Sequence, residues 1–205
     1  MDPDATAWQV LRPLLERRPY LPWTDWALRP AALVAVLNEI VLAKRETIVE
    51  LGSGVSTVVI GRLLAERGGA LASLEHDPDW ATVVRSQLER EDLESTVELL
   101  VAPLDAHPEA WEDAPWYSAE MIAMLPSTIN LLLVDGPPGH GEGMAHSRYP
   151  ALPALAGRLS PNALVVLDDA DREPEQEIVE RWSESLPEWS FAVDTSRGIA
   201  LGSRR

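Results

Sequence analysis

Short, almost wholly apolar segments alternate along this chain with longer segments of helical periodicity, and this alternation constrains the fold most. The apolar segments are Thr47–Leu51, Ala70–Glu75, Thr96–Ala102, Ile129–Asp135 and Ala163–Asp168. Segments of this length and composition are typical of strands that are buried on both faces of a parallel sheet. Because alternating strands and helices favour a parallel sheet with helices on both faces, the sequence predicts an α/β fold.

Start and stop signals mark the helices between these strands. Asp77 supplies an N-cap residue and Pro78 occupies the first helical position of one helix. Pro174 opens another helix, whose first turn is acidic. The pair Gly68-Gly69 ends an earlier helix. These signals support the alternation that the apolar segments indicate.

The last part of the chain departs from this alternation. Trp189–Thr195 and Gly198–Gly202 have the composition of two strands, and only the short turn Ser196-Arg197 separates them. Such a hairpin would place an antiparallel strand in an otherwise parallel sheet.

Residues 1–45 precede the first predicted strand and form a unit of their own. They contain Trp8, Trp23 and Trp26, a Pro-rich stretch, and a predicted helix at Ala31–Lys44. We predict a helical cover over one sheet face, or a lid over the site, since aromatic clusters near a cleft mouth can hold a ligand. Residues 46–205 form the remaining α/β domain.

Composition excludes several classes of protein. Asp and Glu number 33 and Lys and Arg 17, so the formal net charge of −16 disfavours binding to nucleic acids and to anionic membranes. The absence of Cys excludes a disulfide scaffold, a thiolate nucleophile and Cys-ligated metals. No stretch approaches the roughly 20 apolar residues of a membrane span, and the acidic start lacks a secretory signal. We expect a cytoplasmic protein that acts on a small molecule, and we allow for a homodimer.

The strongest local feature is a glycine turn, ELGSGVST at residues 50–57, between a predicted strand and a predicted helix. Gly52 and Gly54 permit a tight turn and close approach of a ligand, and the helix N-terminus attracts a carboxylate or another anion. Thr57 stands where the dinucleotide motif G-x-G-x-x-G has its third glycine, which counts against an NAD site. The alternative is that the glycines serve the turn alone.

Carboxylates follow three of the predicted strands. Glu75 ends the second strand, 25 residues after Glu50, where an acidic residue accepts hydrogen bonds from both ribose hydroxyls of an adenosine. Asp135 follows the fourth strand, and Asp168 and Asp169 follow the fifth. Since parallel strands end at one edge of the sheet, these acids should converge, and a divalent cation would relieve their repulsion. The alternative is that they cap helices, remain solvated or pair with a nearby arginine.

These features, in this order, resemble the class I S-adenosylmethionine-dependent methyltransferases. VELGSGVST is similar to the first motif of that family, SLEHDPDW to the motif with its ribose-binding acid, and the C-terminal hairpin to its reversed last strand. DGPPG, Arg148-Tyr149-Pro150 and DDADR resemble a bacterial small-molecule branch. The resemblance covers about residues 46–202. It implies a Rossmann-like methyltransferase fold, with a mostly parallel seven-stranded sheet, a C-terminal antiparallel hairpin and helices on both faces, and it makes 46–205 the S-adenosylmethionine-binding domain.

The resemblance also implies a cofactor site. The residues implied to bind S-adenosylmethionine are Glu50, Gly52, Ser53, Gly54, Ser56, Thr57, Glu75, His76, Asp77, Leu104 and Asp135. Within this set Glu75 would hold the ribose, and His76 and Asp77 would border the adenine. Leu104 would pack on the adenine, at a point where many members of the family have an acidic or polar residue.

A metal site is implied in the same way. Asp135, Asp168 and Asp169 occupy places similar to those of the metal ligands in catechol-type O-methyltransferases, although the third ligand there is usually Asn. A third carboxylate can still coordinate Mg²⁺. Mg²⁺ is therefore an optional cofactor in this interpretation.

Two histidines are candidate general bases. Lys44 is the only lysine of the chain, so the lysine base of the catechol-type enzymes has no evident equivalent. His140 and His146 follow the fourth strand, and imidazole titrates near neutral pH. We take Asp135 and His140 as the candidate catalytic residues.

Methyl transfer requires mainly that the methyl group and the acceptor are held in line and shielded from water. We therefore expect an S-adenosylmethionine-dependent methyltransferase that acts on a small molecule, favours oxygen as the methylated atom and is open to assistance by Mg²⁺. A non-catalytic S-adenosylmethionine-binding partner protein is the alternative. The missing third glycine and the terminal hairpin disfavour an NAD-dependent oxidoreductase.

Overall fold

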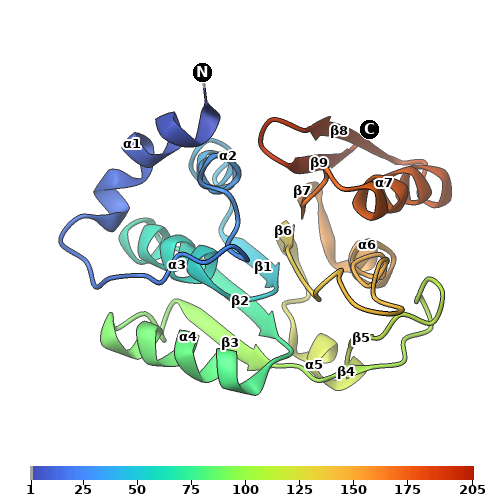
Figure 1. The fold of residues 1–205 in the computed structure, drawn as a ribbon, viewed down its shortest axis with the longest axis horizontal. Helices are drawn as coiled ribbons and strands as arrows, with labels where there is room; N and C mark the ends of the chain where they lie inside the picture. The colour runs from blue at the N-terminus through green and yellow to red at the C-terminus, as the bar shows by residue number, and fades with distance from the viewer. Residues whose placement is uncertain (1) are drawn as a thin grey trace.

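The computed structural model describes residues 2–205, and its centre is a seven-stranded sheet of order β3-β2-β1-β6-β7-β9-β8 (Figure 1). The strands are β1 (Thr47–Leu51), β2 (Ala70–Glu75), β3 (Val97–Val101), β6 (Ile129–Val134), β7 (Leu159–Asp168), β8 (Trp189–Asp194) and β9 (Ile199–Arg204). The first five run parallel, whereas β9 is antiparallel to both β7 and β8. The predicted fold class, with its C-terminal antiparallel hairpin, is confirmed.

Helices cover both faces of this sheet. They are α1 (Pro3–Leu15), α2 (Pro30–Leu42), α3 (Val55–Arg67), α4 (Pro78–Arg90), α5 (Ala119–Met124), α6 (Ala151–Leu155) and α7 (Glu173–Ser185), with a 3-10 turn at Ala156–Arg158. In Figure 1, α1, α2 and α3 lie on one side of the sheet and α6 and α7 on the other. The predicted cap of α4 is present: Asp77 Oδ1 accepts hydrogen bonds from the backbone N–H groups of Asp79 (2.8 Å) and Trp80 (3.2 Å).

The central strands divide their side chains between two hydrophobic cores. In β1, Ile48 belongs to the core under α1–α4, whereas Val49 belongs to the core on the opposite face. Leu131 and Leu132 of β6 divide in the same way. All four side chains are fully buried, which explains why these strands appear in the sequence as continuous apolar runs.

The N-terminal segment is fastened to the helical layer by a buried ion pair. The Arg62 guanidinium of α3 lies 2.7 Å from both carboxylate oxygens of Glu91. It also donates hydrogen bonds to the carbonyl oxygens of Leu14 (2.9 Å) and Pro19 (3.2 Å). The last two hydrogen bonds attach the end of α1 and the segment after it to α3. That residues 1–45 act as a separate cover or lid stays a prediction.

Some element bounds differ from the expectation. β7 begins at Leu159 instead of Ala163, and its pairing with β6 is irregular between Ile129 and Leu131. The intervening Ser160-Pro161-Asn162 resembles a loop in sequence, because Pro is tolerated only near strand ends and irregularities. A second sheet, of β4 (Leu104–Asp105) and β5 (Trp116–Tyr117), has strands too short to show any periodicity.

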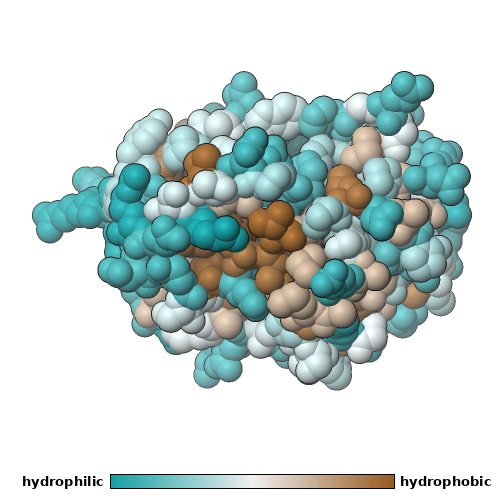
Figure 2. Space-filling view, turned by 90° about the horizontal axis from the view of Figure 1, so that it is seen from below, coloured by the Kyte–Doolittle hydropathy of each residue, from teal (hydrophilic) through white to brown (hydrophobic). Residues whose placement is uncertain are grey.

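The surface is largely polar, as the net charge implies. Figure 2 shows the face seen from below the view of Figure 1, where hydrophilic residues surround a hydrophobic area near the centre. Over residues 2–205, no helix has both the length and the apolar character that crossing a bilayer requires.

Candidate active site

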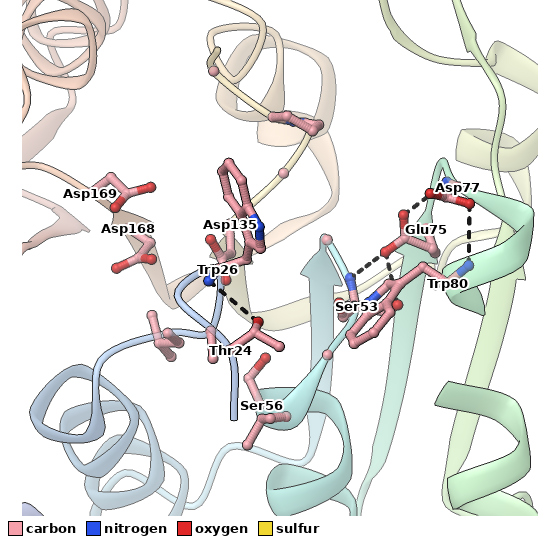
Figure 3. Close-up of a pocket in the computed structure, with 18 of the residues that line it drawn as sticks. Thr24, Trp26, Ser53, Ser56, Glu75, Asp77, Trp80, Asp135, Asp168 and Asp169 are labelled. Carbon is pink, nitrogen blue, oxygen red and sulfur yellow. Dashed lines mark hydrogen bonds between the residues drawn. The ribbon is translucent and has the colours of Figure 1, made fainter. Parts of the chain in front are cut away.

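A cavity of about 610 Å³ lies at the carboxyl ends of β1, β2, β6 and β7 (Figure 3). Of the residues predicted for the site, it is lined by Gly52, Ser53, Gly54, Ser56, Glu75, His76, Asp77, Asp135, His140, Asp168 and Asp169. Glu50, Thr57, Leu104 and His146 do not line it. The fold thus brings the glycine turn and all the predicted strand-end acids, except the buried Glu50, to one space.

Glu75 is a fixed, ionised hydrogen-bond acceptor at one end of this cavity. Ser53 donates to its Oε2 from the backbone N (3.0 Å) and from the hydroxyl (2.9 Å), and the Asp77 backbone N donates to its Oε1 (2.9 Å). His76 Nδ1 lies 3.0 Å from the same Oε1. Burial alone would raise the pKa of Glu75, but the hydrogen bonds from His76, Asp77 and Ser53 bring it below its ordinary value. The indole N–H of Trp80 fixes the turn further by donating to the Ser53 carbonyl oxygen (2.9 Å).

Glu50 and Thr57 support the glycine turn from beneath. Thr57 Oγ1 donates to Glu50 Oε2 at 2.5 Å and accepts from the Gly54 backbone N at 2.8 Å. The Ser73 hydroxyl donates to the same Glu50 oxygen at 2.7 Å. Burial raises the pKa of Glu50 to about 7, despite the hydrogen bonds it accepts. Glu50 and Thr57 shape the turn and do not line the cavity, and the direct cofactor contact expected of them stays a prediction.

The two glycines of the turn have different reasons for being glycine. Gly52 has a φ of +92°, and a Cβ there would lie 2.9 Å from the backbone carbonyl of Asp135. Gly54 has an extended backbone, with φ 173°, and no atom lies within 4 Å of the place of its Cβ. The protein itself does not require a glycine at Gly54, so the open space above it suits a ligand that approaches the backbone closely.

The three predicted aspartates converge at the other end of the cavity. Asp135, Asp168 and Asp169 each place a carboxylate oxygen within 4.8 Å of the others. Burial and the charge of Asp169 raise the pKa of Asp168 to about 6, and burial together with Asp168 raises the pKa of Asp135 well above its ordinary value. Asp169 has a φ of +59°, a left-handed conformation that Asp tolerates better than most residues. The spacing of the oxygens fits a small, oxygen-ligated divalent cation.

Two arginines offset part of this negative charge. The buried Arg148 places Nη1 3.0 Å from Asp169 Oδ2 and Nη2 3.4 Å from Asp135 Oδ1. Arg172 Nη2 lies 2.9 Å from the same Asp169 oxygen and 2.5 Å from Glu175 Oε1. These contacts hold Asp135, Asp169 and Glu175 in fixed positions around the cluster. Sequence reasoning gave Arg148 no role here, although the Arg-Tyr-Pro motif marks it.

Only one of the two candidate bases reaches the cavity. His140 lines it and stacks on Trp26, with ring centroids 4.6 Å apart. His146 instead stacks on Trp111 at 3.8 Å, and its Nε2 lies 2.6 Å from Glu177 Oε2. His146 does not line the cavity, so the geometry favours His140, and the assignment of the base stays a prediction.

The N-terminal segment contributes a wall of the cavity, whereas its role as a lid stays a prediction. The residues involved are Pro22, Thr24, Asp25, Trp26, Ala27, Leu28 and Arg29. Arg29 joins this wall to the loop after β7, because its Nη2 lies 2.6 Å from Asp171 Oδ2.

Leu104 does not line the cavity, and its expected packing on an adenine stays a prediction. It lies in β4 directly opposite Tyr117 of β5, and Tyr117 lines the cavity instead. The sequence gives no sign that Tyr117 lines the cavity in place of Leu104, because each strand of the pair has only two residues.

Comparison with known proteins connects this geometry to a family. A family model described as a methyltransferase domain matches residues 49–170, which is more than half of the chain. No curated protein sequence matches it.

Solved structures with a similar fold have low sequence identity. An S-adenosylhomocysteine-bound methyltransferase of Podospora anserina, PaMTH1, has a TM-score of 0.65 at 14% identity, covering 100% of this chain and 88% of its own. An O-methyltransferase from Bacillus cereus, also in complex with S-adenosylhomocysteine, has a TM-score of 0.61 at 17% identity, with coverages of 100% and 91%. A putative caffeoyl-CoA O-methyltransferase from Staphylococcus aureus has a TM-score of 0.60 at 11% identity, with coverages of 98% and 91%.

Proposed function

The chain belongs to the methyltransferase-domain family, and from this premise we propose that it transfers the methyl group of S-adenosylmethionine to a hydroxyl group of a small-molecule acceptor. One observation carries the proposal: a single cavity has the glycine turn and Glu75 at one end and three converging aspartates at the other. The first end suits a nucleoside with a carboxylate, and the second suits a hydroxyl group that must lose a proton.

Binding of the methyl donor is assigned to the ends of β1 and β2. Glu75 is ionised and would accept hydrogen bonds from the two ribose hydroxyls. Val55 and Ser56, at the N-terminus of α3, line the cavity and would face the methionine carboxylate, which the helix dipole attracts. Gly54 leaves space for the backbone approach. The bound donor supplies an electrophilic methyl group, so the protein has mainly to orient it and exclude water.

The acceptor is assigned to the aspartate end of the cavity. The raised pKa values of Asp135 and Asp168 mean that this pair holds a proton more readily than ordinary carboxyl groups do. Asp135 would orient the acceptor hydroxyl by a hydrogen bond. His140 also lines the cavity and would take up the hydroxyl proton.

Mg²⁺ assistance forms part of the proposal, because the three aspartates fit its preference for oxygen ligands. Asp135, Asp168 and Asp169 would hold the ion. When bound, it would lower the pKa of the acceptor hydroxyl. Arg148 would keep two of these carboxylates in place, since it bridges Asp169 and Asp135.

Oxygen as the methylated atom is supported by two of the similar structures, whose names describe O-methyltransferases. The test is transfer of a labelled methyl group from S-adenosylmethionine to matched acceptors that differ only in a hydroxyl or an amino group. We expect label in the hydroxyl compounds. Transfer only to the amines would overturn the assignment to oxygen. Binding of S-adenosylhomocysteine without transfer to any acceptor would favour a non-catalytic binding protein.

A further inference from the structure

The small sheet of β4 and β5 carries an aromatic residue into the cavity. Tyr117 of β5 lines the cavity, while its neighbour Trp116 is fully buried on the other side of the strand. The loop that joins the two strands is held in place, because Trp111 stacks on His146 and the Arg181 guanidinium lies 4.6 Å above the Trp111 ring. These contacts hold β5, and with it the Tyr117 side chain, in a fixed position.

The hydroxyl group of Tyr117 is buried and has no hydrogen-bond partner among the residues that the structure describes. The side chain is 1% exposed, and its oxygen makes no hydrogen bond within residues 2–205. A Cβ built on Gly136 would lie 2.5 Å from that oxygen and 2.8 Å from the Gly52 Cα. The hydroxyl thus lies against the backbone where the turns after β1 and β6 meet.

A buried donor without a partner is costly, and native proteins satisfy nearly all such groups. Burial and the negative charge of Glu75 raise the pKa of Tyr117 well above its ordinary value, so the phenol keeps its proton at neutral pH. Among residues 2–205 no group accepts that proton, so the phenol is free to donate it to a ligand in the cavity.

We propose that Tyr117 binds the nucleoside part of S-adenosylmethionine, and that its phenolic O–H donates a hydrogen bond to a ribose oxygen. This inference rests on the proposed function. Its chemistry follows from Glu75: ribose hydroxyls that donate to that carboxylate keep free lone pairs, which can accept a hydrogen bond. Tyr117 supplies a neutral donor beside the ionised acceptor, so the two side chains satisfy the ribose together.

The test is calorimetric titration of Tyr117→Phe with S-adenosylhomocysteine. Loss of one neutral hydrogen bond should weaken affinity about fivefold. Because the substitution also removes an unsatisfied buried hydroxyl, the melting temperature of the ligand-free variant should stay equal or rise. Tyr149→Phe is the matched control. Tyr149 is also buried but does not line the cavity, so the affinity of this variant for S-adenosylhomocysteine should equal that of the unaltered protein.

A second titration uses methylthioadenosine, which lacks the amino-acid part. We expect Tyr117→Phe to weaken affinity for this ligand by the same factor. A loss with S-adenosylhomocysteine alone would overturn the assignment to the nucleoside, and unchanged affinity or a mere loss of stability in Tyr117→Phe would overturn a binding role. Failure of the unaltered protein to bind S-adenosylhomocysteine would overturn the proposed function and this inference with it.

Discussion

Ser53 directs both of its hydrogen-bond donors at one oxygen of Glu75, the backbone N–H at 3.0 Å and the hydroxyl at 2.9 Å. The two residues are 22 positions apart and belong to the ends of adjacent parallel strands. Their contact joins the glycine turn to the strand-end carboxylate. Hydrogen bonds from within the protein therefore keep the Glu75 carboxylate ionised and oriented.

Replacing Glu75 by Ala should weaken binding of S-adenosylhomocysteine strongly. The variant loses a charged acceptor of two hydrogen bonds, which is worth roughly 1.5–3 kcal/mol of binding free energy. Calorimetry measures the change. Glu98→Ala is the control, since Glu98 lies exposed on β3 and away from the cavity. Equal affinity in the two variants would remove Glu75 from the ribose site.

The two glycines of the turn should respond differently to Ala. Gly54→Ala should leave the melting temperature nearly unchanged and reduce affinity for S-adenosylhomocysteine, because its Cβ meets only open cavity space. Gly52→Ala should lower stability by about 1–3 kcal/mol, since its φ is positive and its Cβ would contact the Asp135 backbone at 2.9 Å. Thermal unfolding and calorimetry separate the two effects. Normal binding by a folded Gly54→Ala variant would contradict the placement of the donor.

Sequence reasoning located the parts of the site that depend on strand ends. Gly52, Glu75 and Asp135 each follow a strand that appears as an apolar run, and parallel strands must end at one edge of the sheet. Which of these side chains face the cavity and which lie beneath the turn could not be predicted in this way. Nothing local distinguishes Glu50, which lies beneath the turn, from Glu75, which borders the cavity. Tyr117 was missed because tertiary contacts place its two-residue strand.

Arginines illustrate the same limit. That one of the acids after β7 pairs with Arg172 could be considered from their proximity in sequence, and Arg172 does contact Asp169. Arg148 contacts the same aspartate from 21 positions away. A contact between a long side chain and a residue far away in the sequence produces no local sequence pattern. Such a contact can be identified only in the folded structure.

The stability of the protein should fall as the pH rises from about 4.5 to about 7, owing to Glu50. Its pKa is about 7 in the folded protein and 4.5 ordinarily, so the folded state holds more protons in this range. Glu50→Gln removes the buried charge and should stabilise the protein at about pH 8 by on the order of 2 kcal/mol, with little gain at about pH 4. Thermal unfolding at both pH values tests this. An equal effect at both, or the same gain in the exposed control Glu98→Gln, would contradict it.

Asp168→Asn tests the metal and the acceptor end. The metal account predicts that methyl transfer falls at least about tenfold while affinity for S-adenosylhomocysteine is kept, because the donor binds at the other end of the cavity. EDTA should reproduce this loss in the unaltered protein, and added Mg²⁺ should restore it. The control Glu98→Gln changes an exposed acid on β3 that does not line the cavity, and it should keep its activity. Full activity in EDTA would remove Mg²⁺ from the account.

The most direct test of the central claim, that this cavity binds S-adenosylmethionine, is calorimetric titration of the unaltered protein with S-adenosylhomocysteine, with NAD titrated in parallel. The account predicts saturable binding of one S-adenosylhomocysteine per chain and no binding of NAD, since Thr57 replaces the third glycine of a dinucleotide turn and supports Gly54 from beneath. Saturable binding of NAD, or the absence of binding of S-adenosylhomocysteine to the folded protein, would contradict it.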